Sequence, residues 1–282
     1  MTPRMTQPTT GPLTQAEYVH GYQPEEQQRL HDQAGALAQL LHADTRYPAG
    51  SRVLEAGCGV GAQTLTLARR SPGALFTAID IDPASVEATR RRCAEAGLAG
   101  VQVLQADLMQ PPFAPASFDH AFVCFVLEHL ARPHEALATL RGLLRPGGTL
   151  TVIEGDHGTT LMHPDDADAR AAVDALVQLQ RRAGGDALIG RRLHPLLAAA
   201  GFDGVRVSPR MVYADGSNPA LGEAFTRCTF TAMVEGVRAP VLAAGLLDAQ
   251  RFDAGVQALH RAAEADGVFG YTFFKAVGRR PG

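Results

Sequence analysis

The chain of 282 residues lacks a basic excess, a long apolar run and a secretory leader pattern. Its net charge of -3 at pH 7 provides no positive field to hold a nucleic-acid backbone. No apolar run approaches the roughly 18 residues that a membrane span needs. Residues 1–13 are polar and rich in Thr and Pro, unlike a signal peptide. We therefore expect neither nucleic acid nor a membrane as a partner.

Cysteine is also scarce, and the cysteines present are not spaced for metal or redox chemistry. They are Cys58, Cys93, Cys124 and Cys228. This pattern favours a reduced, cytoplasmic setting without a bound metal. Aromatic residues make up only 6% of the chain, but hydrophobic residues reach 46%, enough for one large domain with additions.

What the sequence does contain is a glycine-rich bend after an apolar strand. Residues 53–64 read Val-Leu-Glu-Ala-Gly-Cys-Gly-Val-Gly-Ala-Gln-Thr. Gly57, Gly59 and Gly61 allow a sharp turn and let a ligand approach the main chain. The helix expected next points its free N–H groups at that ligand, which favours an anionic group such as a carboxylate or phosphate.

Two ligands are compatible with this bend. Gly57, Gly59 and Ala62, with Asp80 further on, fit the looser nicotinamide-dinucleotide fingerprint. Glu55 favours the other ligand, because its carboxylate would repel a pyrophosphate but attract an ammonium or sulfonium cation. S-adenosylmethionine carries both of those cations and a carboxylate.

Further segments complete a resemblance to the class I S-adenosylmethionine-dependent methyltransferases, specifically the small-molecule branch with a methyltransferase-11/25-type domain. These segments are residues 78–82 (Ala-Ile-Asp-Ile-Asp), 105–108 (Gln-Ala-Asp-Leu) with Pro112-Phe113, 117–119, 124–130 (Cys-Phe-Val-Leu-Glu-His-Leu) and 144–148 (Leu-Arg-Pro-Gly-Gly). The resemblance covers about residues 51–153, and the joint order and spacing of the motifs carry it.

The resemblance implies S-adenosyl-L-methionine as the cofactor and S-adenosyl-L-homocysteine as its product. It implies that Asp80 takes the ribose hydroxyls, Ile81 lies against the adenine and Asp107 meets the adenine amino group. The full set of expected cofactor-binding residues is Tyr22, Glu55, Gly57, Cys58, Gly59, Gly61, Gln63, Asp80, Ile81, Asp107, Leu108, Cys124 and Phe125. For Tyr22 an alternative is open, in which Tyr18, His20 and Tyr22 only pack the N-terminal helix onto the domain.

The expected fold class is α/β, a doubly wound, mostly parallel seven-stranded sheet of the Rossmann-like methyltransferase type. Short β-rich apolar runs separated by helical spacing support it. They are residues 52–54, 75–79, 101–104, 120–126 and 149–153. A sixth strand at 205–212 and a seventh at 268–277, antiparallel to its neighbours, are implied by the resemblance.

The expected domain organisation has three parts. Residues 1–13 are predicted to be disordered, and 14–47 to form a helical N-terminal cover. Residues 48–282 form the methyltransferase domain, with helical cap insertions at about 158–189 and 214–265. The oligomeric state is open, although the cover could pack across a homodimer.

Candidate catalytic residues follow the fifth strand, at 154–157 (Glu-Gly-Asp-His), where we expect a loop. An acceptor hydroxyl or amine must lose a proton, so His157 is the candidate base, with Asp156 or Glu154 orienting it or binding the acceptor. His129 and Tyr213 are candidate substrate contacts. Simpler roles stay open for them: turn capping for His157, loop anchoring for His129 and surface placement for Tyr213.

The sequence thus predicts an enzyme that transfers a methyl group in line to a small-molecule acceptor, possibly a natural product. A cofactor-binding protein without catalysis, a nucleic-acid methyltransferase and a nicotinamide-dependent oxidoreductase are the alternatives. The segment Cys-Phe-Val-Leu at 124–127 differs from the Asn/Asp-Pro-Pro-aromatic run of enzymes that methylate base amines.

Overall fold

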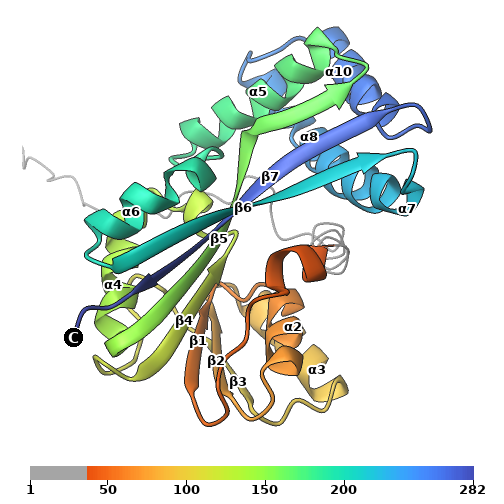
Figure 1. The fold of residues 1–282 in the computed structure, drawn as a ribbon. Helices are drawn as coiled ribbons and strands as arrows, with labels where there is room; N and C mark the ends of the chain where they lie inside the picture. Colours follow the sequence, from red (N-terminus) through yellow and green to blue (C-terminus); the bar gives the residue numbers. More distant parts are fainter. Residues whose placement is uncertain (1–36) are drawn as a thin grey trace, which may run out of the picture.

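The computed structural model describes residues 37–282, which form one seven-stranded sheet flanked by helices (Figure 1). The strands are β1 (Arg52–Ala56), β2 (Leu75–Asp80), β3 (Val101–Gln105), β4 (Phe118–Cys124), β5 (Leu144–His163), β6 (Asp203–Asp215) and β7 (Val268–Arg279). Their order is β3-β2-β1-β4-β5-β7-β6. Only β7 runs antiparallel, to both β5 and β6, whereas β1 to β5 pair in parallel. The predicted doubly wound, mostly parallel seven-stranded fold is confirmed.

Helices cover both faces of the sheet. They are α2 (Ala62–Arg70), α3 (Pro83–Glu95), α4 (Pro133–Leu143), α5 (Ala167–Arg182), α6 (Leu193–Ala199), α7 (Pro219–Leu221), α8 (Ala232–Gly236), α9 (Arg238–Ala243) and α10 (Ala249–Arg261), with short turns η1 (Leu127–His129) and η2 (Ile189–Arg192). Apolar side chains of α4 and α6 share one core, and those of α2, α5 and α10 share another on the opposite face. Among residues 37–282, no helix is both long and apolar enough to cross a bilayer.

The N-terminal cover is described only from residue 37, where residues 37–42 are helical. Leu37 and Leu41 are buried in the same core as Phe122 and Ile153 of the sheet. Tyr18, His20 and Tyr22 lie outside the described residues, as does the predicted disorder of residues 1–13. The predicted division of the chain at residues 13 and 47 stays a prediction.

The fifth strand is much longer than the expected 149–153, because β5 continues to His163. Residues 154–157, expected in a loop, therefore lie inside the strand and pair with β7 up to Asp156, before a shift in register. The extended parts of β5, β6 and β7 continue the sheet beyond the other strands. The helices α5 and α10 pack against each other beside this extension (Figure 1). The predicted insertion at 158–189 thus begins as strand and turns helical only at α5.

The second insertion contains an unusual helix. Between α7 and α8 the chain forms a π-helix, η3, over Gly222–Thr231. π-Helical segments are rare and occur often at functional sites.

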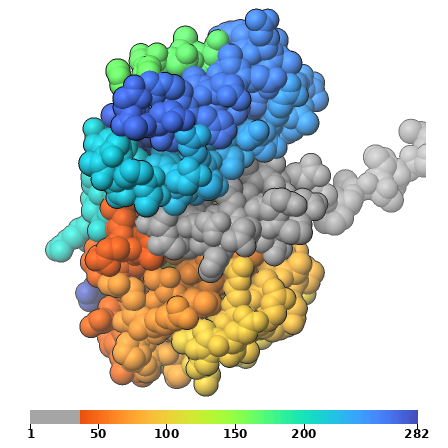
Figure 2. All heavy atoms as spheres, turned by 90° about the vertical axis from the view of Figure 1, so that its right-hand side faces the viewer, coloured from red at the N-terminus to blue at the C-terminus, as the bar shows by residue number. Residues whose placement is uncertain are grey.

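In Figure 2 the helices of residues 219–261 (blue) and the α2–α3 region (orange to yellow) lie at opposite ends of the visible face.

An aromatic cluster joins η3 to β7. Phe225 and Phe230 of η3 contact Phe269, Tyr271 and Phe273, with ring centroids 4.8–6.2 Å apart. All five side chains are at most 3% exposed, so the cluster forms core.

This cluster requires a glycine on β5. A Cβ placed on Gly155 would overlap the hydroxyl of Tyr271. Overpacking of this kind typically costs about 1–3 kcal/mol. We expect Gly155→Ala to lower the free energy of unfolding by that amount in urea titrations.

The matched control is Gly142→Ala in α4, where a Cβ would meet no heavy atom within 4 Å. Alanine is the better helix former, so this variant should be neutral or more stable by up to about 1 kcal/mol. Equal unfolding midpoints for the two variants would contradict the packing of Tyr271 over Gly155.

Candidate active site

The carboxyl ends of β1, β2 and β4 meet at one edge of the sheet, where the glycine bend follows β1 (Figure 1). The backbone N–H groups of Gly57 and Cys58 donate to the carbonyl oxygen of Ile79, at 2.8 and 2.9 Å. Gly57 has φ of 75°, and a Cβ there would overlap Val126. At Gly59 a Cβ would meet no heavy atom within 4 Å, so the bend faces open space where a ligand can approach the main chain.

Glu55 lies beneath this bend, near the carboxyl end of β1, and its side chain is buried (2% exposed). Within the described part of the chain, its Oε2 atom has no hydrogen-bond partner. Burial, and to a smaller extent the nearby carboxylate of Asp80, raise the pKa of Glu55 to about 8, although the Thr64 hydroxyl close to the carboxyl partly offsets them. A buried carboxyl with a free oxygen is costly unless a cation or donor reaches it. The site therefore fits a cationic ligand.

Two neighbours at the tip of β2 suit an adenosine. Asp80 accepts hydrogen bonds from the backbone N–H of Gly59 at 2.8 Å and of Asp82 at 3.0 Å, and remains partly exposed. The next residue, Ile81, leaves an apolar side chain 39% exposed. At the end of β3, Asp107 accepts from the N–H of Met109 at 2.7 Å, beside buried Leu108. The structure thus gathers the residues expected to contact ribose and adenine at one edge.

Phe125 follows β4 in a strained conformation, with φ of 58°, a region that aromatic residues rarely adopt. Its N–H donates to the carbonyl oxygen of Ile153 at 2.9 Å, and its ring lies 5.3 Å from that of Phe273. Strain of this kind costs roughly 1–3 kcal/mol and tends to occur at functional sites. Cys58 and Cys124 are buried nearby, and burial raises the pKa of both thiols, so they are un-ionised at neutral pH.

Gln63, in the first turn of α2, contacts the N-terminal cover. Its Oε1 lies 2.6 Å from Nε2 of His42. Tyr22 lies outside the described residues and cannot be placed. Within residues 37–282, no group of three or more His, Cys, Asp and Glu side chains is arranged to hold a metal.

Glu154 has a different role from the expected one. Its Oε1 accepts from the backbone N–H groups of Val126, at 3.1 Å, and Leu127, at 2.8 Å. Alternation along β5 places Glu154 on the opposite face of the sheet from Gly155 and Tyr271, so it does not orient His157. Burial, and then repulsion by Glu128, raise the pKa of Glu154 well above its usual value. Glu154 therefore anchors the loop after β4.

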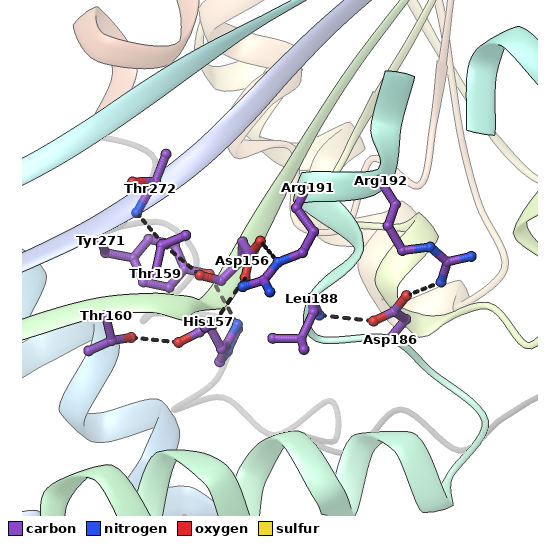
Figure 3. Close-up of polar contacts among 11 residues, drawn as sticks. Asp156, His157, Thr159, Thr160, Asp186, Leu188, Arg191, Arg192, Tyr271 and Thr272 are labelled. Atoms are coloured by element: carbon purple, nitrogen blue, oxygen red, sulfur yellow. Dashed lines mark hydrogen bonds and ion pairs between the residues drawn. The ribbon is translucent and has the colours of Figure 1, made fainter. Parts of the chain in front are cut away.

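The carboxylate of Asp156 binds an arginine and not His157 (Figure 3). It is fully buried and binds Arg191 of η2 through both oxygens, at 2.5 and 2.7 Å, while the N–H of Gly158 donates to it at 3.0 Å. The expectation that Asp156 orients His157 is wrong, because successive side chains on a strand face opposite sides. The pair joins β5 to η2.

His157 has Tyr271 as its partner. The hydroxyl of Tyr271 lies 3.1 Å from Nδ1 of the imidazole, and the rings meet edge to face at 5.6 Å (Figure 3). Nε2 is buried and has no partner among the described residues. Burial lowers the pKa of His157, so the imidazole is neutral and one nitrogen can accept a proton.

The other candidate contacts are divided between the two faces of the sheet. Next to His129, Glu128 lies 3.6 Å from it and accepts from the Gln180 amide at 3.3 Å. Tyr213 on β6 pairs with Gly270, so it lies on the opposite face from Tyr271 and is 52% exposed. The expected contact of Tyr213 with a substrate stays a prediction.

The chain resembles known methyltransferases in sequence and in structure. A family model described as a methyltransferase domain matches residues 54–152. An uncharacterised 37.1 kDa protein in transposon TN4556 of Streptomyces fradiae is 37% identical over 155 residues, which cover 54% of this chain and 44% of that protein. The demethylmenaquinone methyltransferase of Tropheryma whipplei is 35% identical over 116 residues, which cover 41% and 46%.

The chain spans less than half the length of both relatives. By structure, the chain resembles phosphoethanolamine N-methyltransferase 2 of Haemonchus contortus, solved with S-adenosylhomocysteine. The TM-score is 0.55 at 16% identity, over 89% of this chain and 53% of that one. The chain shares the fold of this methyltransferase. Residues 54–152, which match the methyltransferase-domain model, contain the glycine bend, the tips of β2 and β3 and the loop after β4.

Sequence reasoning missed Tyr271, Gln180, Arg191 and His42. Each contacts a residue that is distant from it in the sequence, so no local spacing marks it. Tyr271 alone could have been suspected, because it sits in the aromatic run that ends the chain.

The structural role of Asp156 can be tested by Asp156→Asn. We expect the free energy of unfolding to fall by about 1.5–3 kcal/mol, because a buried charge-assisted pair is lost. Affinity for S-adenosylhomocysteine, measured by calorimetry, should not change.

Asp186→Asn is the matched control. Asp186 also pairs with an arginine, Arg192, and accepts from the N–H two residues on, but this pair is exposed. Its loss should cost less than about 1 kcal/mol. A stable Asp156→Asn variant with weakened cofactor binding would contradict the structural role.

Proposed function

We propose that the protein transfers a methyl group from S-adenosylmethionine to a small-molecule acceptor. The observation that carries this proposal is Glu55, a buried carboxyl with a free oxygen at a glycine bend that faces open space. Asp80 adds a second carboxylate beside it. A cationic adenosyl donor favours ionisation of the Glu55 carboxyl, whereas the pyrophosphate of a dinucleotide offers it no cation.

The other proposed contacts with the cofactor follow from the arrangement of residues at the carboxyl edge of the sheet. The bend from Gly57 to Gly61, with Cys58 beneath it, receives the methionine part near the N-terminus of α2, where Gln63 lies. Asp80 receives the ribose, while Ile81, Asp107 and Leu108 surround the adenine. Phe125 and Cys124 close the site from β4. Tyr22 stays a prediction.

When bound, S-adenosylmethionine supplies a methyl carbon activated by its sulfonium. The protein has to hold the acceptor in line and exclude water. His157 supplies the base: with Nδ1–H donating to the hydroxyl oxygen of Tyr271, its buried Nε2 takes the proton of an acceptor hydroxyl or amine. His129, beside Glu128, contacts the acceptor from the loop after β4.

The partner classes are part of the same proposal. A net charge of -3 and the absence of a basic stripe support a small molecule over nucleic acid. The cytoplasmic setting and the homodimer stay predictions.

Cofactor binding should depend on pH through Glu55. Between pH 6 and 8 the free protein holds this carboxyl protonated, and a bound cation favours its ionised form. Binding of S-adenosylmethionine should therefore release a proton, and its affinity should rise with pH by up to about tenfold per unit before levelling above pH 8.

Calorimetry in buffers of different ionisation enthalpy measures this proton release. Glu55→Gln should bind more weakly and lose both the release and the pH dependence. A wild-type affinity that is constant from pH 6 to 8 would argue against a role for Glu55 in holding the cation.

The base is tested by His157→Gln, with His134→Gln in the exposed first turn of α4 as the control. Methyl transfer from tritiated S-adenosylmethionine to a panel of hydroquinones, naphthols and amines gives the rate. We expect His157→Gln to lose about 10²- to 10⁴-fold in turnover with unchanged affinity for S-adenosylhomocysteine. Normal turnover would remove His157 from proton transfer.

A further inference from the structure

The end of the N-terminal cover is attached to the sheet by a buried lysine. Lys275 on β7 is 3% exposed. Its ammonium donates to Asp44 and Thr45, both at 2.6 Å, and to the carbonyl oxygen of Leu41 at 3.3 Å. Three acceptors thus match its three protons, which is the condition under which a buried ammonium is stable. The lysine fixes the chain on both sides of residue 42.

Two further groups hold the same segment. Asp44 also pairs with Arg210 of β6. Partial burial raises the pKa of Asp44, but hydrogen bonds from Lys275 and Arg210 outweigh it and lower the pKa to about 2. On the other side, the guanidinium of Arg70, at the end of α2, donates to the carbonyl oxygen of Ala43 at 2.6 Å. The segment is therefore joined to β6, β7 and α2 together.

His42 lies at the centre of this joint and is fully buried. Its ring is 5.7 Å from that of Phe122, and Nε2 is 2.6 Å from Oε1 of Gln63. Burial lowers the pKa of His42 to about 4, so the ring is neutral and carries one N–H. Nδ1 has no partner among the described residues. With the amide of Gln63 in this orientation, its carbonyl oxygen accepts from His42, and the proton lies on Nε2.

Gln63 is the second residue of α2, two positions after Gly61. No acidic residue occupies the first turn of this nine-residue helix, so its free N–H groups favour an anion. Beneath the same bend, the free oxygen of buried Glu55 independently marks a ligand site. With Oε1 of Gln63 held by His42, its amide N–H groups form no hydrogen bond to side chains or backbone within residues 37–282 and can bind a ligand.

We propose that His42 is a positioning residue for the donor's methionine carboxylate: it holds Oε1 of Gln63 so that the amide N–H groups face that carboxylate, and Lys275 holds His42. This rests on the proposed binding of S-adenosylmethionine at the glycine bend. The reversed amide would instead donate to His42 and present Oε1 to the ammonium of the ligand.

Calorimetry with two ligands separates these arrangements. S-adenosylhomocysteine carries the amino-acid carboxylate, and 5′-methylthioadenosine lacks the whole amino-acid part. The variants are His42→Phe, which keeps a ring against Phe122, Gln63→Glu and Lys275→Met. Thr66→Val is the control, on the same helix and bonded only within it. Thermal unfolding confirms that each variant is folded.

We expect His42→Phe to bind S-adenosylhomocysteine about 3- to 30-fold more weakly, as for a lost hydrogen bond to a charged group, with unchanged affinity for methylthioadenosine. Lys275→Met should show the same selectivity. Gln63→Glu should lose more, because two carboxylates then meet. Thr66→Val should bind both ligands as the wild type does.

Equal losses for both ligands would show a purely structural role and overturn the proposal. Unchanged binding by His42→Phe would overturn it as well, as would tighter binding of S-adenosylhomocysteine by Gln63→Glu, the mark of the reversed amide. If Lys275→Met does not fold, the ligand affinities of His42→Phe and Gln63→Glu still test the proposal. A wild-type protein that binds neither ligand would contradict the proposed function itself, and this inference would fall with it.

Discussion

The structure depends on the burial of carboxyl groups at the carboxyl edge of a parallel sheet. Glu55 on β1 and Glu154 on β5, with β4 between them, are both nearly inaccessible, and burial raises the pKa of each. Their surroundings differ, however. In both, Oε2 has no hydrogen-bond partner among the described residues, but Oε1 of Glu154 accepts from two backbone N–H groups of the loop after β4, whereas Glu55 lies beneath the glycine bend. Glu154 therefore anchors a loop, and Glu55 is the carboxyl that we propose for the ligand.

The side chains on the two faces of β5 make different contacts. Glu154 and Asp156 point to the face of α4 and η2, where they hold the loop after β4 and Arg191. His157 points to the other face, toward Tyr271 and the aromatic cluster of η3. The proposed base and the scaffold contacts thus come from neighbouring residues of one strand, and the alternation of side chains keeps them apart. On the same face as His157, Lys275 ties the N-terminal cover to the cofactor edge.

Sequence reasoning predicted the fold, and the expected cofactor residues lie together at one edge of the sheet, because both features are encoded locally. The glycine bend, Asp80 and Asp107 each follow a short apolar strand, and parallel strands bring such ends together. It failed at residues 154–157, where one glycine, two carboxylates and a histidine resemble a loop. Pairing with β7, more than a hundred residues later, keeps this segment extended. The Asp156–Arg191 and Lys275–Asp44 pairs and the π-helical turn of η3 likewise depend on distant packing that no local pattern records.

The central claim is that the Glu55 carboxyl is protonated in the free protein and ionises against a bound cation. Difference infrared spectroscopy of the free and the S-adenosylmethionine-bound protein at neutral pH tests it most directly, with Glu55→Gln identifying the band. We predict that the band of a protonated carboxyl disappears on binding and that Glu55→Gln shows no such change. A protonated Glu55 band that persists in the complex, or the same change in Glu55→Gln, would contradict the account.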